Sequence, residues 1–171
     1  MRAVLSTFTG SILHASKRMI SSVYKFPPII QANDAIKLFG QPNVKFVDGS
    51  WHLNSARSNK NEFIEERIAG AKFFDIEDIS DKSSPYPHML PSSQEFSAKM
   101  QSLGISSNDH IIVYAKPEAF SAARVWWMFN VFGHQKVSVL NGGIATWKKA
   151  GTMPMLRALC DACHYYAPIL I

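Results

Sequence analysis

The sequence predicts an α/β domain in which helices cover both faces of a mostly parallel central sheet. Short apolar segments of strand length alternate along the chain with segments of helical periodicity, and short connections join them. The segment at residues 110–114 has Ile-Ile-Val at its centre, as expected of a strand buried on both faces. Because ligands of such sheets gather at the carboxyl ends of the strands, we expect a functional site there.

The first predicted elements are a helix at residues 33–39 and a strand at residues 44–47. Asn33 is the expected N-cap of this helix, and Gly40 is its stop. The strand is largely apolar, and Asp48 after it is expected to cap the following turn. We then expect a polar loop, a short helical turn and a second strand, at residues 51–61, 62–67 and 72–76.

Three prolines predict an irregular, stiff loop at residues 78–91, because proline donates no backbone hydrogen bond and has a fixed φ. The helix after this loop has the spacing of a capping box at Ser92 and Glu95, and Gly104 is its stop. Residues 110–114 are the third predicted strand.

The same alternation continues to residue 150. A turn at residues 115–119 precedes a helix at residues 120–132 that is apolar nearly all round, which predicts burial. A fourth strand at residues 137–140 and a last helix at residues 144–150 follow. Four aromatic side chains of this part are expected in the core: Trp126, Trp127, Phe129 and Phe132.

The formal net charge of +5 is concentrated near the N-terminus. Four of the 18 basic residues and none of the 13 acidic residues precede Asp34, which leaves 14 basic against 13 acidic residues from there on. We expect no nucleic-acid partner for so nearly neutral a domain. No segment approaches the roughly 18 to 20 apolar residues of a membrane-spanning helix, so we expect no membrane partner either.

Residues 1–26 have the composition of a mitochondrial transit peptide. They are rich in serine and threonine, contain basic residues and lack acidic ones, and can form a basic amphipathic helix. A secretory signal fits less well, because no unbroken apolar stretch precedes a small-residue cleavage site. The alternative is a merely disordered N-terminus, or one that results from a mispredicted start codon. We therefore expect a transit peptide at residues 1–26, a domain at residues 27–154 and a location in the mitochondrial matrix.

The turn at residues 115–119 is where such a sheet would hold a nucleophile. Backbone N–H groups and a helix N-terminus lower the pKa of a thiol at this position. The turn begins with Ala115 and contains Lys116 and Glu118, but no cysteine, serine or histidine. We therefore predict no nucleophile in this loop.

Four sequence strings closely resemble those of a known family, and they occur in the family's order: EERIAGAKFFDIEDISD at residues 65–81, SPYPHMLP at 84–91, RVWWMFNVFGH at 124–134 and VSVLNGGIATWKKAG at 137–151. They resemble the N-terminal half of two-domain rhodaneses and 3-mercaptopyruvate sulfurtransferases, over about residues 28–154. The resemblance implies a rhodanese-like fold. It also implies transfer of a sulfane sulfur from thiosulfate or 3-mercaptopyruvate through a cysteine persulfide, with no metal or organic cofactor.

The same resemblance implies a division of roles. In the family the nucleophilic cysteine belongs to the second domain, and the N-terminal domain is an inactive wall of the cleft between them. Ala115 stands where the second domain has its cysteine, so the chain matches the inactive half. Asp75 and His88 align with an acidic residue and a histidine that approach the active site across the cleft, and Arg124 aligns with an arginine at the domain interface.

Each of these three residues also has a structural interpretation. Asp75 would cap a loop, His88 would pack among the prolines around it, and Arg124 would pair with a carboxylate at a helix start. The segment before Arg124 departs from the family at one position, because it has Ala-Ala where relatives have Ala-Pro.

Residues 155–171 do not resemble the family, and we expect them to be a divergent, disordered tail. The tail contains both cysteines of the chain, Cys160 and Cys163, followed by His164. This string has the form of a c-type haem attachment site or a redox pair, but no strand and helix support either, and a zinc ion would need a fourth ligand. We expect no metal and no cofactor. A truncated or alternatively spliced product, or a mispredicted gene end, would explain the loss of resemblance.

Three functional hypotheses follow. In the first, the chain is the N-terminal part of a mitochondrial sulfurtransferase, inactive alone, which meets its small sulfur-donor substrate only when joined to a second rhodanese domain. In the second, it is a non-catalytic module that binds a small anion or a protein, or self-associates, through the exposed cleft wall near Asp75, His88 and Arg124. In the third, a tail cysteine carries the sulfur.

Overall fold

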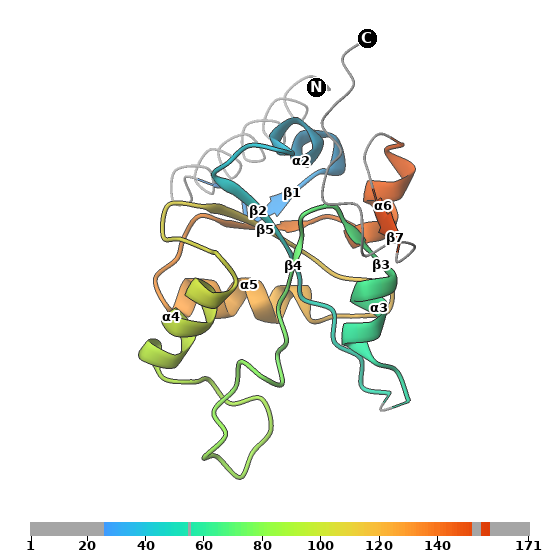
Figure 1. Cartoon of the computed structure of the whole chain (residues 1–171). Helices are drawn as coiled ribbons and strands as arrows, with labels where there is room; N and C mark the ends of the chain where they lie inside the picture. Colours follow the sequence, from blue (N-terminus) through green and yellow to red (C-terminus); the bar gives the residue numbers. More distant parts are fainter. Residues whose placement is uncertain (1–25, 55, 152–154, 158–171) are drawn as a thin grey trace, which may run out of the picture.

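The computed structural model describes residues 26–54, 56–151 and 155–157 (Figure 1). The expected transit peptide up to residue 25 lies outside the described residues, and so do Cys160 and Cys163. Phe26, which we assigned to the transit peptide, packs its ring against His110 with 4.6 Å between ring centroids and so contacts the domain. None of the described helices is long and apolar enough to cross a membrane.

A five-stranded sheet forms the centre of the domain, and all neighbouring strands in it are parallel. The strand order is β1-β6-β5-β2-β4, which places β5 in the middle. The bounds of these strands are Ile29–Ile30 for β1, Val44–Asp48 for β2, Lys72–Phe73 for β4, His110–Tyr114 for β5 and Val137–Leu140 for β6.

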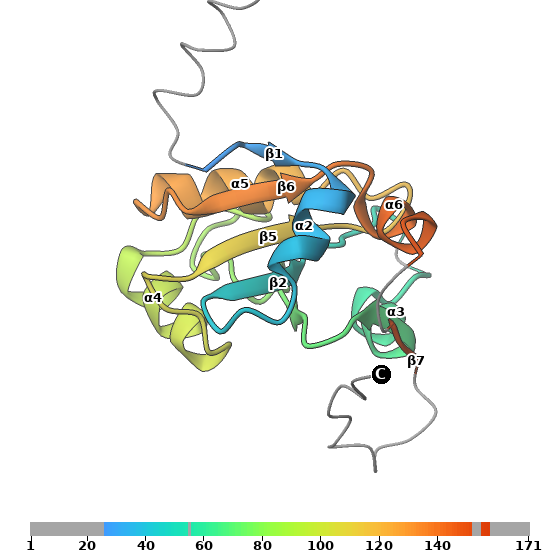
Figure 2. The ribbon, with the colours of Figure 1, turned by 90° about the horizontal axis from the view of Figure 1, so that it is seen from above.

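Helices cover both faces of this sheet, with α2 and α6 on one side and α4 and α5 on the other (Figures 1 and 2). Their bounds are Ala32–Leu38 for α2, Asn59–Glu65 for α3, Ser93–Ser102 for α4, Ala122–Val131 for α5 and Gly143–Lys149 for α6. The predicted α/β class with a mostly parallel sheet is therefore confirmed.

Alternate side chains of β5 pack into two core layers. Ile111 and Val113 belong to the layer that contains Phe129 of α5, and Ile112 belongs to the layer that contains Trp147 of α6. Both layers are closed to solvent, which explains why the centre of this strand is apolar without interruption.

The first two helices differ from their predicted bounds. Helix α2 begins at Ala32 after Gln31, whose side chain makes no cap hydrogen bond, so the prediction of Asn33 as N-cap is wrong. Helix α3 begins earlier than predicted because Ser58 caps it by accepting a hydrogen bond from the Asn61 N–H at 3.3 Å. The residues after it form β3, Glu66–Ile68.

The second predicted strand is much shorter than expected, because β4 ends at Phe73. Asp75 begins a turn directly after it, in which its carbonyl oxygen accepts a hydrogen bond from the Ile79 N–H at 2.8 Å. The proline-rich loop then runs without regular structure to α4, whose capping box between Ser92 and Glu95 is confirmed.

The predicted boundary of the tail also differs from the structure. Strand β7, Met155–Arg157, pairs antiparallel with β3, with Ile68 opposite Met155. The first three residues of the expected tail are therefore a strand, and residues 158–171 lie outside the described residues.

Helix α5 is buried only on the side that faces the sheet, so the burial predicted from its apolar sequence is confirmed for that side alone. It begins at Ala122 rather than at Phe120, and the Phe120 side chain is 93% exposed. Val125 and Phe129 face the sheet, whereas Trp127 is 40% exposed and does not belong to the core. A helix on a sheet can bury only the stripe that faces the sheet, and apolar residues on its other side mark a surface for something else.

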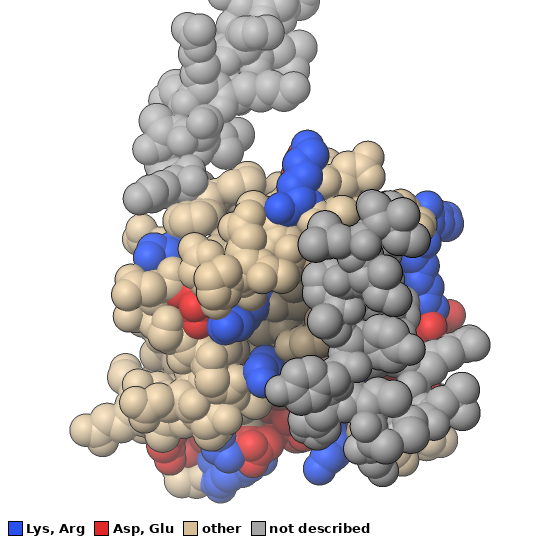
Figure 3. Space-filling model, turned by 45° about the horizontal axis from the view of Figure 1, so that its top comes forward, with Lys and Arg blue, Asp and Glu red and all other residues tan. Residues whose placement is uncertain are grey.

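Charged side chains of both signs are scattered over the surface that Figure 3 presents, with uncharged surface between them. This distribution agrees with the near balance of basic and acidic residues from Asp34 onward.

Candidate functional site

The loops that follow β2, β4 and β5 lie at the carboxyl edge of the sheet, because these three strands are parallel neighbours. This edge is where ligands bind in open α/β sheets. The sequence places Ala115, His88 and Arg124 in or after these loops, and the structure brings two of the three into direct contact.

Ala115 begins the loop after β5 and lies buried against the start of α6. Its carbonyl oxygen accepts a hydrogen bond from the Ile144 N–H at 3.1 Å. The next residue, Lys116, donates its backbone N–H to the Ser50 hydroxyl at 2.8 Å. The loop is thus fixed at both residues, and it starts with a methyl group where a nucleophile would need a thiol.

A buried carboxylate is linked to this loop through Ser50. Asp48 is fully buried, and its Oδ1 accepts hydrogen bonds from the Ser50 N–H at 2.9 Å and the Ser50 hydroxyl at 2.5 Å. Burial raises the pKa of Asp48 above its ordinary value. The expectation that Asp48 caps the turn after its strand is confirmed, and through Ser50 the same carboxylate holds Lys116 in place.

A serine joins the loop after β5 to the loop after β2. The Ser121 hydroxyl donates to the carbonyl oxygen of Gly49 at 2.5 Å and accepts a hydrogen bond from the Trp51 N–H at 2.8 Å. This link fixes the backbone from which the Trp51 side chain reaches toward the loop after β4.

Asp75 caps its own turn. Its Oδ1 accepts hydrogen bonds from the backbone N–H groups of Glu77 at 3.0 Å and Asp78 at 3.3 Å. The structure does not bring Asp75 together with His88.

Glu77, two residues after Asp75, is the carboxylate that lies beside His88. Its Oε1 accepts hydrogen bonds from His88 Nε2 at 2.9 Å and from the Trp51 indole N–H at 2.8 Å. The hydrogen bond from His88, with the second one from Trp51, holds the pKa of Glu77 below its ordinary value. Sequence reasoning missed Glu77, although it lies two residues after Asp75 in the same string.

His88 makes three contacts with other parts of the domain. Its ring meets the Trp51 ring edge-on with 4.9 Å between centroids, its Nε2 meets Glu77, and its carbonyl oxygen accepts a hydrogen bond from Arg124 Nη2 at 2.7 Å. Its backbone φ of 57° lies in the left-handed region, which is uncommon for a residue with a side chain.

Arg124 lies in the first turn of α5, and its guanidinium group also stacks over the Trp127 ring at 4.5 Å from the ring centroid. The structural interpretation predicted that Arg124 would pair with a carboxylate. Among the described residues, Arg124 makes no such ion pair. Arg124 instead joins the Trp127 surface to the backbone of His88.

An open groove of about 800 Å³ lies beside these residues. Apolar side chains dominate its walls, and several are freely exposed, with 86% for Leu53, 93% for Phe120 and 46% for Met89. We call the surface of Leu53, Met89, Phe120 and Trp127 the apolar cleft face. His88 lies at the edge of this exposed apolar surface, which is of the kind that marks binding sites.

Charged side chains also fix the loop after β5 through ion pairs and hydrogen bonds. The Arg57 guanidinium donates to both carboxylate oxygens of Glu62, at 2.7 and 2.9 Å, and reaches Glu118 at 3.4 Å. Hydrogen bonding to Arg57 lowers the pKa of Glu62. The Lys116 ammonium group donates to the Glu62 carbonyl oxygen. Lys116 and Glu118 therefore both have partners that fix the loop after β5.

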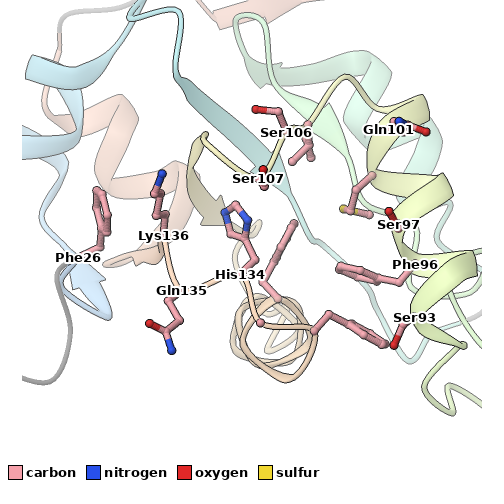
Figure 4. Close-up of a pocket in the computed structure, with 15 residues that line it drawn as sticks. Phe26, Ser93, Phe96, Ser97, Gln101, Ser106, Ser107, His134, Gln135 and Lys136 are labelled. Atoms are coloured by element: carbon pink, nitrogen blue, oxygen red, sulfur yellow. The ribbon is translucent and has the colours of Figure 1, made fainter.

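A second groove, of about 730 Å³, lies at the opposite edge of the sheet (Figure 4). It is lined by aromatic rings and by serine and glutamine side chains, and Lys136 is the one lysine or arginine among its described lining residues. Burial lowers the pKa of His134 in its wall. No group of three or more histidine, cysteine, aspartate or glutamate side chains able to hold a metal ion occurs in the described part of the chain.

The chain matches the model of the rhodanese-like domain over residues 31–150. It is 48% identical over 112 residues to the thiosulfate sulfurtransferase of Bos taurus, an alignment that covers 64% of this chain and 38% of that protein. It is 41% identical over 132 residues to the mitochondrial thiosulfate/3-mercaptopyruvate sulfurtransferase 1 of Arabidopsis thaliana, covering 77% of this chain and 35% of that protein. The chain thus spans less than half the length of these relatives.

Solved structures agree. The 3-mercaptopyruvate sulfurtransferase SseA from Escherichia coli superposes with a TM-score of 0.70 at 37% identity, covering 74% of this chain and 49% of SseA. The Tum1 protein from Saccharomyces cerevisiae superposes with a TM-score of 0.67 at 36% identity, covering 74% of this chain and 43% of Tum1.

Proposed function

Because this chain belongs to the rhodanese-like family, we propose that it forms one wall of the substrate cleft of a mitochondrial sulfurtransferase, with thiosulfate or 3-mercaptopyruvate as the sulfur donor. The observation that carries this proposal is the Glu77–His88 pair at the edge of an open apolar groove, close to a loop that begins with Ala115. The chain supplies the wall and the pair, and a second rhodanese domain supplies the nucleophile.

In the proposed reaction the second domain provides the nucleophile, and this chain provides the group that transfers protons. A cysteine thiolate of the second domain attacks the transferable sulfur of the donor, the bond between that sulfur and the rest of the donor breaks, and a persulfide forms on the cysteine. Sulfite leaves with the electron pair of that bond when the donor is thiosulfate, and pyruvate leaves as its enolate and takes up a proton when the donor is 3-mercaptopyruvate. The persulfide sulfur then passes to an acceptor such as cyanide. Because a thiol must lose its proton before it attacks, His88, oriented by Glu77, takes up and returns protons at the cleft.

Ala115 makes the chain inactive by itself under this proposal. A methyl group neither ionises nor forms a persulfide, so steady-state sulfur transfer to cyanide by the purified full chain should not exceed background with either donor. Turnover that disappears in Cys160→Ser or Cys163→Ser would overturn the proposal and make the tail the sulfur carrier.

A chimera tests the cleft wall directly. Residues 27–154 replace the matched half of Escherichia coli SseA, and sulfur transfer from 3-mercaptopyruvate is measured. We expect the chimera to be active and His88→Gln in it to lower kcat by about 10²-fold or more, as expected for the loss of a general acid–base group. Lys99→Ala is the control, because Lys99 pairs with Asp78 at the surface and does not line the groove. An active chimera indifferent to His88→Gln would contradict the proposed role.

The apolar cleft face favours a second candidate function, a non-catalytic module that self-associates through this face. Phe120 and Leu53 are large apolar side chains that are almost fully exposed and line the same groove. Exposed apolar surface of this kind often marks an interaction site. Sedimentation velocity over a range of concentrations should show a dimer that Phe120→Ser weakens. Val131→Ser is the control, since Val131 is 48% exposed on α5 and does not line the groove. A chain that stays monomeric at all concentrations would remove this candidate.

Targeting to the mitochondrial matrix completes the proposal, with residues 1–26 as the transit peptide. The composition of these residues supports it, and so does the mitochondrial name of the Arabidopsis thaliana relative. A fluorescent protein fused behind residues 1–26 should enter mitochondria, and a fusion with Arg2, Lys17 and Arg18 changed to glutamate should not. Equal distribution of the two fusions would contradict the assignment.

A further inference from the structure

We propose that Arg124 is a positioning residue that holds the imidazole of His88 against Glu77 by binding the carbonyl oxygen of His88 while it is anchored on the ring of Trp127. This inference rests on the proposed function, in which His88 faces the substrate. In this role Arg124 acts on His88 through the backbone of the loop after β4. The role differs from both earlier interpretations, an arginine at a domain interface and an arginine paired with a carboxylate.

The first step is the conformation of His88. Its φ of 57° is a left-handed conformation in which a side chain crowds its own backbone. The neighbouring Pro87 donates no backbone hydrogen bond, and the loop has no regular structure. Such a conformation persists only where surrounding contacts determine it.

The second step is the contact that determines it. Arg124 Nη2 donates to the His88 carbonyl oxygen at 2.7 Å, a hydrogen bond from a charged group and therefore a strong one. With the carbonyl group held on the α5 side, the imidazole lies where its Nε2 reaches Glu77 at 2.9 Å and its ring meets Trp51.

The third step is the anchor of Arg124. The planar guanidinium lies 4.5 Å from the centroid of the Trp127 ring, and its Nε is buried without a hydrogen-bond partner among the described residues. A rigid group stacked on a ring presents its Nη2 in one direction, which the flexible ammonium of a lysine does not do. Trp127 lines the groove, so the anchor is part of the same wall that His88 serves.

The experiment is nuclear magnetic resonance on the full chain, with readouts that a purely structural role would not move. The first is the displacement of the His88 ring-proton signals by the Trp51 ring. The second is the titration midpoint of the Glu77 carboxyl group, whose pKa His88 lowers in the folded protein. The Trp51 indole N–H signal reports whether the Trp51–Glu77 hydrogen bond is intact.

In Arg124→Gln we expect the His88 signals to move toward those of a free histidine and the Glu77 midpoint to rise, while the Trp51 indole signal stays in place. Arg124→Lys should restore part of both effects, because an ammonium group can still donate to the carbonyl oxygen. His88 and Glu77 signals unchanged in Arg124→Gln would overturn the inference, and so would a lysine that restores both completely, because the stacked guanidinium would then not be needed.

Arg67→Gln is the matched control, because Arg67 also stacks on an aromatic ring, that of Phe63 at 5.1 Å, and donates to backbone carbonyl oxygens, but away from the groove. It should leave both readouts unchanged. If Arg124→Gln fails to fold, Trp127→Leu removes only the anchor. It should shift both signals in the same direction by a smaller amount, and no shift would overturn the inference.

These readouts need no turnover. A chimera without sulfur transfer whose His88 and Glu77 signals respond as expected would count against the proposed function and leave the positioning role supported.

Discussion

Replacing Gly143 with alanine should destabilise the domain by far more than the same change at a glycine with open surroundings. Gly143 begins α6 with a φ of 57°, and a Cβ there would lie well inside van der Waals contact of the Ala115 carbonyl oxygen and 3.3 Å from the carbonyl carbon. That oxygen cannot move away cheaply, because it accepts the hydrogen bond of the Ile144 N–H.

The magnitude has two parts. A left-handed conformation costs an alanine about 1–2 kcal/mol relative to glycine. Forcing an atom into a packed site costs about 1–3 kcal/mol more. We therefore expect Gly143→Ala to lower the free energy of unfolding by about 2–5 kcal/mol.

Gly104→Ala isolates the first part. Gly104 follows α4 with a φ of 71°, and a Cβ added there would meet no atom within 4 Å. It should lower the free energy of unfolding by about 1–2 kcal/mol. Urea unfolding of the full chain, followed by circular dichroism, measures both variants. Equal losses in the two variants would refute the reasoning that the loop after β5 and the start of α6 are in tight contact.

Three further predictions follow from single contacts. Ser92→Ala removes the capping box of α4 and should cost about 1 kcal/mol in thermal unfolding, whereas Ser93→Ala one residue later should cost little. Burial lowers the pKa of His110 from 6.5 to about 4, so the stability it contributes is present above pH 6.5 and falls by on the order of 3 kcal/mol as the pH drops toward 4. Urea midpoints of His110→Asn should depend less on pH over this range, and an unchanged slope would contradict the assignment. The lowered pKa of Glu77 contributes stability that is present above its unfolded pKa and is lost as the pH falls through its folded pKa. Glu77→Gln should remove that acid-dependent loss, and a variant with the wild-type profile would show that the exposed pair contributes nothing measurable.

Much of the fold follows from local sequence. The strands at residues 110–114 and 137–140 have the predicted bounds, because short segments rich in β-branched apolar residues favour a buried strand. The capping box at Ser92 is equally local, since all its partners lie within three residues. The prediction of Asn33 as the N-cap of α2 was wrong for the converse reason. The start of this helix follows from the packing of Ala35 in the core and not from the capping side chain that the sequence offers.

The site was only partly predictable. His88 and Arg124 could be singled out because they occur within strings that resemble a family, and Ala115 because it begins the turn between a predicted strand and a predicted helix. Glu77 was missed, because it lies two residues from Asp75 and only the turn decides which of the two carboxylates faces His88. Trp127 was assigned to the core because helical periodicity shows that a helix is apolar, but not what lies against each side of it.

Residue types in short segments were enough to predict the parallel α/β class, the position of the loop after the middle strand and the lack of cysteine, serine and histidine in that loop. The connection of Glu77, His88, Trp51 and Arg124 into one group, and the apolar surface beside them, became visible only in the folded domain. Contacts between residues 51, 77, 88 and 124 depend on how three loops and a helix are placed by the sheet, and that placement is set by long-range packing rather than by any local pattern.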